Sequence, residues 1–365
     1  MARYRNADLS HLVHVGGSLT RVLAGYPTDS AEVSPPGPRL RAITRALQDA
    51  GSPDSDIATM TTTLEQRSAD RHRTARYLAI QDGVLLLDEL LPEAHLQGDE
   101  ASFNSLPALV PLILQRQSEV PYVVLEASAG GGRVRTFLAG GSEADERITG
   151  ETEHLHKAQG GASAHFRHAH HTEEVWKRNE TELADVVNQL VERHDVGLLV
   201  VTGDPHVIDL VKNALSSRSH AILTTLASDT VAAGASAEGL NVFLAEQLGR
   251  IVRERQVGLI DRAAVQHGTS PTSDQGLEAI VDALQQAAVE TLLLDLDGLT
   301  VETLVSLSRE PWVAAVASET FGARILGTVA AAEALTRAAI ATEADVVIVE
   351  HGTLPGKASA AVIRR

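Results

Sequence analysis

The sequence predicts a mixed α/β protein with several domains. Short apolar runs alternate with amphipathic, helix-like segments between residues 122 and 256, and a second alternating set covers residues 277–350. Such alternation is typical of sheets that are covered by helices. The chain has 365 residues, enough for two or three domains that each bury a core. We predict three domains, at residues 1–118, 119–260 and 261–365.

The first domain is expected to be of the α+β class. A proline-rich break at Ser34–Pro38 precedes an amphipathic segment. A helical pattern covers Thr61–Arg76, and the residues after it read as two strands joined at Asp82-Gly83, a common hairpin sequence. The run at 106–115 contains two prolines and is expected to be a connector into the next domain.

The central domain begins with an expected strand at Tyr122–Ser128, a glycine-rich turn and a second strand. Residues 140–161 show no periodicity and are expected to be irregular. A strong helix is expected at about Glu173–Arg193, because apolar residues recur along one face. A buried strand then leads to Asp204, a candidate cap for a helix that starts at proline. A further strand at 221–226 and a helix at 239–256 complete the domain.

The last domain is expected after a hinge at residues 257–273, which contain glycine and proline. Helices are expected at Leu277–Ala288, Thr300–Ser308 and Ala330–Thr342, and strands at Thr291–Asp295, Trp312–Ala317 and Asp345–Glu350. This order predicts a second, smaller α/β sandwich.

Composition narrows the range of functions. The formal net charge is −17, and residues 261–365 alone carry 7 basic and 14 acidic side chains. This charge opposes broad attraction to phosphates, so any RNA contact has to use local basic patches. The chain has no cysteine, its first 20 residues lack the apolar centre of a secretory signal, and no apolar run is long enough for a membrane span. We expect a cytoplasmic protein.

Two motifs resemble phosphate chemistry but lack residues that it requires. Asp295-Leu-Asp297-Gly298 follows an apolar run and is similar to the nucleophile motif of haloacid-dehalogenase-type phosphatases. Leu299 stands where those enzymes have threonine, and the only later lysine is Lys357. The turn AGGGRVRTF lacks the Gly-Lys-Ser/Thr ending of a phosphate loop. We expect a strand end with a helix cap at the first motif and a hairpin turn at the second.

The segment KAQGGASAHFRHAHH, residues 157–171, is the strongest candidate site. Its histidines form a conceivable metal site, yet no Asp, Glu or Cys lies among residues 154–172, and the histidines do not share one helical face. We therefore expect no metal and no cofactor. Contact with RNA fits better, since glycines permit close backbone approach and the polar side chains donate hydrogen bonds. An ordinary surface loop is the remaining alternative.

Residues 160–167, Gly-Gly-Ala-Ser-Ala-His-Phe-Arg, resemble the Gly-Gly-Gln loop of the archaeo-eukaryotic peptide release factors and Pelota. The chain looks most like bacterial members of this superfamily, such as the ribosome hibernation factor Balon. The resemblance implies a ribonuclease-H-like central domain and an α/β sandwich at the C-terminus that is similar to Pelota and kink-turn RNA-binding proteins. The first domain is divergent and corresponds by position only.

Ala162 departs from the family pattern. The family has its catalytic glutamine there, which helps to orient the attacking water. A methyl group cannot orient water, and Gln159 lies on the other side of the glycines. The resemblance therefore implies a factor that occupies the A site of idle 70S ribosomes without releasing peptide. The alternatives are a peptidyl-tRNA hydrolase or release factor for stalled ribosomes, and an RNA-binding or signalling protein that never meets ribosomes.

The residues expected to contact ribosomal RNA form two groups. The first group lies in the candidate loop and comprises Lys157, Gln159, Gly160, Gly161, Ser163, His165, Arg167 and His168. The second comprises Arg67, Arg71, Arg73 and Arg76, for which a solvated helix face is the alternative. For the acidic last domain the resemblance implies docking to a translational GTPase, elongation factor Tu, and we expect no membrane partner.

Overall fold

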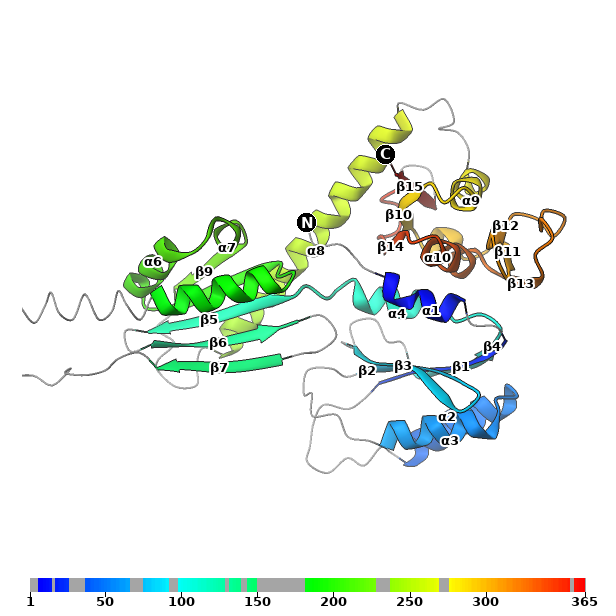
Figure 1. Cartoon of the computed structure of the whole chain (residues 1–365), viewed down its shortest axis with the longest axis horizontal. Coiled ribbons are helices and arrows are strands. Elements are labelled where there is room, and N and C mark those ends of the chain that lie inside the picture. The colour runs from blue at the N-terminus through cyan, green and yellow to red at the C-terminus, as the bar shows by residue number, and fades with distance from the viewer. Residues whose placement is uncertain are drawn as a thin grey trace, which may run out of the picture. The chain divides into compact units, whose positions relative to one another are not determined.

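The computed structural model describes residues 6–14, 17–25, 37–65, 75–91, 98–128, 131–138, 143–149, 181–227, 237–268, 276–354 and 358–364 (Figure 1). The chain forms two compact units. The central unit is Val120–Ile251, and the split unit combines Arg3–Glu119 with Val252–Arg365. Helices and strands occur in both, which confirms the predicted α/β class. The division into three domains stays a prediction, because Arg3–Glu119 and Val252–Arg365 pack together as one compact unit.

The central unit is built on a five-stranded sheet of order β7-β6-β5-β8-β9. Its strands are β5 (Tyr122–Ser128), β6 (Gly131–Phe137), β7 (Glu143–Thr149), β8 (Leu198–Gly203) and β9 (Leu223–Ala227). β5, β6 and β7 are antiparallel neighbours, whereas β8 and β9 run parallel to β5. β7 lies in the stretch predicted to be irregular, so that prediction was wrong there. Residues 144–146 of this edge strand are exposed, and it therefore lacks an alternating apolar pattern.

Helices cover both faces of this sheet. Val123 and Leu125 pack with the helix over residues 181–193 and with α6 (Pro205–Ala214). Val124 packs on the opposite face with Leu240 and Leu244 of α8 (Ala237–Gly268), as the alternation of strand side chains requires. The predicted helix at Glu173–Arg193 is confirmed over residues 181–193. A short helix, α7 (Ser217–Ala221), precedes β9.

The helix α8 replaces most of the predicted hinge at residues 257–273, since it continues to Gly268. Leu259, Ile260 and Ala263 pack on strands of the split unit. This packing outweighs the cost of about 1 kcal/mol that glycine imposes inside a helix, and Gly258 therefore does not interrupt it.

The first segment of the split unit contains an antiparallel sheet of order β3-β2-β1-β4. The strands are β1 (Leu19–Gly25), β2 (Ala75–Gln81), β3 (Val84–Leu91) and β4 (Glu100–Asn104). The predicted hairpin at Asp82-Gly83 is confirmed: both residues have positive φ, 52° and 78°, as the favoured two-residue hairpin turn requires.

Helices cover both faces of this sheet as well. α2 (Gly37–Asp49) and α3 (Asp54–Glu65) pack on one face, and η1 (Ala7–Leu9), α1 (Ser10–Val13) and α4 (Val110–Arg116) belong to the core on the other. The helix predicted for Thr61–Arg76 was wrong at its end, because Arg76 lies in β2. The predicted connector at 106–115 forms α4 instead, since Pro111 is tolerated in a first helical turn.

The last segment carries two three-stranded sheets, of order β14-β10-β15 and β12-β11-β13. Their strands are β10 (Val289–Leu294), β11 (Thr303–Leu307), β12 (Val313–Ala314), β13 (Ile325–Ala330), β14 (Asp345–Ile348) and β15 (Ser359–Ile363). The helices α9 (Leu277–Gln285) and α10 (Ala331–Ala341) confirm two predicted helices. The helix predicted at Thr300–Ser308 was wrong. Residues 304–307 are all buried in β11, and a short, fully buried strand has no period that distinguishes it from a helix.

One hydrophobic core joins the two segments of the split unit. Leu12 of α1, Tyr77 of β2 and Leu112 of α4 belong to the same buried cluster as Leu335 of α10 and Val346 of β14. The first segment therefore shares its interior with the last. None of the described helices combines the length and the apolar composition that a bilayer span requires.

Candidate functional site

The carboxyl edge of the central sheet is the candidate functional edge. Ala127 of β5 pairs with Gly203 of β8, and Gly203 pairs with Ala227 of β9. Gly131, at the start of β6, pairs with Thr149 at the end of β7. The ends of β5, β7, β8 and β9 therefore meet at one edge (Figure 1). In open α/β sheets, ligands bind outside the carboxyl ends of the parallel strands.

The candidate loop starts at this edge. Residues 150–180 follow β7 and precede the helix over residues 181–193. All eight predicted loop contacts, from Lys157 to His168, fall outside the described residues, as does the histidine cluster considered for metal binding. Among the residues that the structure describes, no group of three His, Cys, Asp or Glu side chains is arranged to hold a metal ion.

Close packing fixes the helix that follows the loop. Leu183 and Val187 are fully buried. A Cβ atom added to Gly132 of β6 would lie 3.0 Å from Leu183 Cδ2 and 2.9 Å from the carbonyl oxygen of Glu126. Glycine at this position therefore lets the helix approach the sheet, and the chain leaves the loop at a rigid point.

A second glycine shapes the edge itself. Gly203 has φ +133°, and an added Cβ would lie 2.0 Å from the carbonyl oxygen of Ala127, so only glycine fits. The next residue, Asp204, accepts a hydrogen bond of 2.8 Å from the backbone N–H of His206. This confirms the predicted cap of α6.

The arginines of β6 are neutralised by neighbouring acids. Arg133 Nε donates to Asp145 Oδ1 at 2.8 Å, and Arg135 Nη2 donates to Glu126 Oε1 at 2.7 Å. Within the described residues, Arg135 Nε and the hydroxyl of Thr202 are buried without a hydrogen-bond partner. These two arginines of the sheet face thus supply little free positive charge.

Arg76, from the second predicted group, is engaged inside the split unit. Its side chain is 8% exposed, and Nε and Nη2 each donate to the carboxylate of Asp88 at 2.7 Å. Nη1 also donates to the carbonyl of Thr63 at 2.7 Å. We predicted that Arg76 contacts RNA, but its guanidinium already forms hydrogen bonds that link β2 to β3 and to α3. Arg67, Arg71 and Arg73 lie outside the described residues.

The acidic motif at Asp295 has a structural role. Its side chain is 3% exposed and accepts hydrogen bonds of 3.0 Å from His351 Nδ1 and from the backbone N–H groups of Gly298 and Gly352. Burial alone would raise the pKa of Asp295, but these hydrogen bonds outweigh it and lower the pKa below its ordinary value. The predicted strand end is confirmed, because β10 stops at Leu294. In the following turn, η2 (Asp297–Leu299), the N–H of Gly298 donates to Asp295 and not to Asp297.

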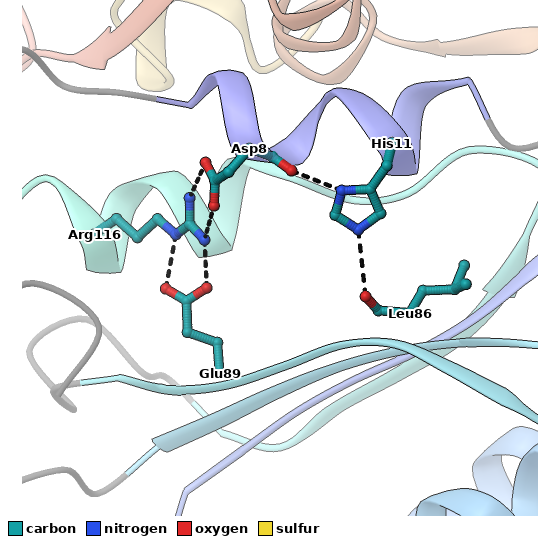
Figure 2. Close-up of polar contacts among 5 residues, drawn as sticks. All are labelled: Asp8, His11, Leu86, Glu89 and Arg116. Atoms are coloured by element: carbon teal, nitrogen blue, oxygen red, sulfur yellow. Dashed lines mark hydrogen bonds and ion pairs between the residues drawn. The ribbon is translucent and has the colours of Figure 1, made fainter. Parts of the chain in front are cut away.

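Sequence reasoning missed a partly exposed polar network around Arg116 (Figure 2). Its guanidinium donates to both oxygens of Asp8, at 3.0 and 2.9 Å, and through Nε to Glu89 at 2.7 Å. Burial alone would lower the pKa of Arg116. The hydrogen bonds and negative charges of Glu89 and Asp8 outweigh this effect and raise the pKa above its ordinary value. His11 bridges the carbonyls of Asp8 and Leu86. The network joins η1, β3 and α4, whose residues are too far apart in sequence to give a local signal.

Comparison with known proteins gives one family match and several distant structural neighbours. Residues 121–269 match the model of bacterial archaeo-eukaryotic release factor family 2. Among solved structures, Pelota of Archaeoglobus fulgidus aligns with 14% identity and a TM-score of 0.34, covering 99% of this chain and 92% of that one. Dom34 of S. cerevisiae, a translation termination-like factor, aligns with 9% identity and a TM-score of 0.37, covering 80% of each chain.

An archaeal translation termination factor also aligns, with 13% identity, a TM-score of 0.25 and coverage of 96% of this chain and 94% of that one. These TM-scores lie below 0.5, so the assignment rests on the sequence match over residues 121–269. No curated protein matches the chain at a significant level.

Proposed function

We propose that this chain, whose residues 121–269 match the model of bacterial archaeo-eukaryotic release factor family 2, is a ribosome-binding hibernation factor. It occupies the A site of idle 70S ribosomes, as Balon-type members of the superfamily do, and it performs no peptide release. In this proposal the protein is cytoplasmic, and the Gly160-Gly161 segment is directed at the catalytic RNA of the large subunit.

The observation that carries the proposal is the attachment of the candidate loop. It starts after Thr149 at the carboxyl edge of a five-stranded sheet and ends in a helix whose Leu183 and Val187 are fully buried. Loops that make functional contacts are usually held by such a rigid scaffold. The sequence of the loop places two glycines beside basic and polar residues, a composition that suits close contact with RNA.

The absence of release chemistry follows from Ala162. Hydrolysis of an ester needs a water molecule held in line with the carbonyl, and a polar side chain has to orient that water. The methyl group of Ala162 offers no hydrogen bond. A peptidyl-tRNA hydrolase or release factor is the second candidate function, because Gln159 stands immediately before the glycines.

The proposed contacts with ribosomal RNA are those of the loop. Lys157 and Arg167 supply charge, whereas Gln159, Gly160, Gly161, Ser163, His165 and His168 supply hydrogen bonds and close approach. Arg67, Arg71 and Arg73 are proposed to face small-subunit RNA, whereas the side chain of Arg76 is 8% exposed and paired with Asp88. The acidic segment 261–365 is proposed to dock a translational GTPase, elongation factor Tu, because its charge suits a protein surface better than RNA.

Co-sedimentation with 70S ribosomes tests the binding proposal. We expect the purified chain to pellet with vacant ribosomes and the double charge reversal Lys157→Glu with Arg167→Glu to lose most of this binding. The matched control reverses Lys212 and Arg218, which are exposed on α6 and α7 of the same unit, and should bind like the parent. Equal binding by all three proteins would remove the loop from the interface. No pelleting at all would favour a protein that never meets ribosomes.

A release assay separates the two candidate functions. Ribosomes that carry labelled peptidyl-tRNA are incubated with the chain, and we expect no peptide to appear above background. Release that is abolished by Gln159→Ala would establish the hydrolase instead.

A further inference from the structure

The connection between β12 and β13 exposes apolar side chains. Phe321 is 71% exposed, Val316 is 50% exposed, and Ile325, at the start of β13, is 42% exposed. The connection is the orange loop beside the labels β11, β12 and β13 in Figure 1. A single exposed apolar residue is ordinary on a protein surface. An aromatic ring with two aliphatic neighbours in one short connection is instead typical of an interaction site.

The backbone holds Phe321 in a conformation that bulky residues avoid. Its φ is +49°, and that of the next residue, Gly322, is +78°. This left-handed region suits glycine, whereas a large side chain there is an outlier. The ring gains little burial in return, because most of its surface is exposed. Strain of this kind gathers at functional positions, which makes Phe321 a candidate contact residue.

Hydrogen bonds and a small core fix the connection beneath the ring. The N–H of Ala323 donates to the carbonyl of Thr320 at 2.8 Å and closes the turn around Phe321. Arg309 Nη2 donates to the carbonyl of Gly322 at 2.9 Å. Ala323 belongs to the buried cluster of this small sheet, together with Val305, Leu307 and Ala314. The ring is therefore presented by an ordered turn, and an ordered turn loses less conformational entropy when a partner binds.

Charge narrows the kind of partner that the ring contacts. Residues 261–365 carry 7 basic and 14 acidic side chains, so RNA phosphates repel this segment. A second copy of the chain would bring two acidic segments together. Within residues 309–324 two acids and two bases balance one another, so the ring makes an apolar contact while the whole segment supplies the attraction. The complementary partner is a protein surface with an apolar pocket and basic side chains around it.

We propose that Phe321, with Val316 and Ile325, is the anchor by which the last segment docks onto a translational GTPase. This inference rests on the function proposed above, and it adds the surface that makes the contact and the chemistry of that contact. The ring enters an apolar pocket of the GTPase, and basic side chains around the pocket face the acidic segment. Aromatic anchors that become buried in this way carry most of the binding energy of protein interfaces.

Isothermal titration calorimetry with purified elongation factor Tu, loaded with a non-hydrolysable GTP analogue, tests the anchor on the full chain. Phe321→Gly removes the ring and should weaken binding at least about 30-fold. It should keep about the melting temperature of the parent, because glycine fits the positive φ. The matched control Val301→Ser changes an apolar side chain of the same segment that is 86% exposed outside the connection, and it should bind like the parent. Val316→Asp is a second variant of the patch and decides the test if Phe321→Gly melts early.

Two results would overturn the anchor. One is binding of Phe321→Gly, or of Val316→Asp in its place, within about threefold of the parent. The other is a parent that pellets with 70S ribosomes but does not bind elongation factor Tu, which refutes the anchor and leaves the ribosomal function standing. A parent that binds elongation factor Tu through Phe321 but never pellets with ribosomes refutes the ribosomal function instead. Sedimentation velocity checks self-association: a dimer that Phe321→Gly abolishes would assign the ring to a second copy and not to the GTPase.

Discussion

Asp295 shows how a side chain can look catalytic in sequence and be structural in the fold. Three donors, from Gly298, His351 and Gly352, converge on its buried carboxylate. An acceptor saturated in this way is a poor nucleophile, because attack would require it to give up these hydrogen bonds. The residue therefore closes the turn between β10 and the end of β14.

Replacing Asp295 by alanine is expected to destabilise the protein. The change leaves two backbone N–H groups unpaired, at about 1–3 kcal/mol for each that stays buried. The pKa of Asp295 is lowered on folding, so its contribution is present above the ordinary pKa and is lost as the pH falls through the folded value. Urea unfolding at pH 7 and pH 3 measures both effects. Asp297→Ala is the control and should change the free energy of unfolding by less than about 0.5 kcal/mol, because Asp297 is exposed.

At the scale of elements, the edge of the central sheet depends on how closely β5 and β8 approach. Gly203 ends β8 beside Ala127 of β5 and turns the chain into α6. Gly132 plays the corresponding part in β6, where the helix after the loop packs. Both glycines allow close packing in the central unit, Gly203 between β8 and β5 and Gly132 between β6 and the helix over residues 181–193.

Gly203→Ala is expected to destabilise the central unit by about 3 kcal/mol or more, since the added Cβ meets a backbone oxygen at 2.0 Å and φ is +133°. Gly239→Ala is the matched control. No atom lies within 4 Å of its added Cβ in α8, and alanine should stabilise the helix by up to about 1 kcal/mol. Denaturant titration followed by circular dichroism compares the two variants. Equal stability would show that the edge relaxes around the new methyl group.

At the scale of the whole molecule, the first and last segments depend on each other because they share one hydrophobic core. Leu12 and Leu112 lie in one cluster with Leu335 and Val346, and Glu333, Arg337 and Gln117 add polar contacts across the same junction. Removal of one segment would expose apolar surface of the other.

A truncation experiment follows from this arrangement. Residues 120–251 have clusters of their own and are expected to fold alone, giving a dispersed amide NMR spectrum. Residues 252–365 alone are expected to be unfolded or aggregated, and to regain structure when residues 1–119 are supplied in trans. A well-folded 252–365 fragment would show instead that the last segment is an independent domain.

Local patterns carried much of the prediction. The alternation of strands and helices, the hairpin at Asp82-Gly83 and the cap at Asp204 depend on neighbours within a few residues, and short-range physics decides them. The motif around Gly160-Gly161 lies within residues 121–269, which match the family model, and the RNA contacts of this motif stay a prediction.

Long-range placement explains the failures. Arg76 has the sequence neighbourhood of a basic helix, yet Asp88 and Thr63 claim it once β2 pairs with β3. The polar strand β7 exists because β6 offers it a partner. In neither case do the nearest residues in sequence carry the decisive contact.

By itself, the sequence determined the α/β class, which is written in the local alternation of its segments, and it carries the prediction that Ala162 stands where release factors have glutamine. Only the tertiary structure decided that the first and last segments share a core. It also decided that Glu333 of the last segment caps α4 of the first segment, and that three hydrogen-bond donors surround the carboxylate of Asp295. Those outcomes depend on contacts between residues up to hundreds of positions apart, and such contacts exist only after the chain has folded.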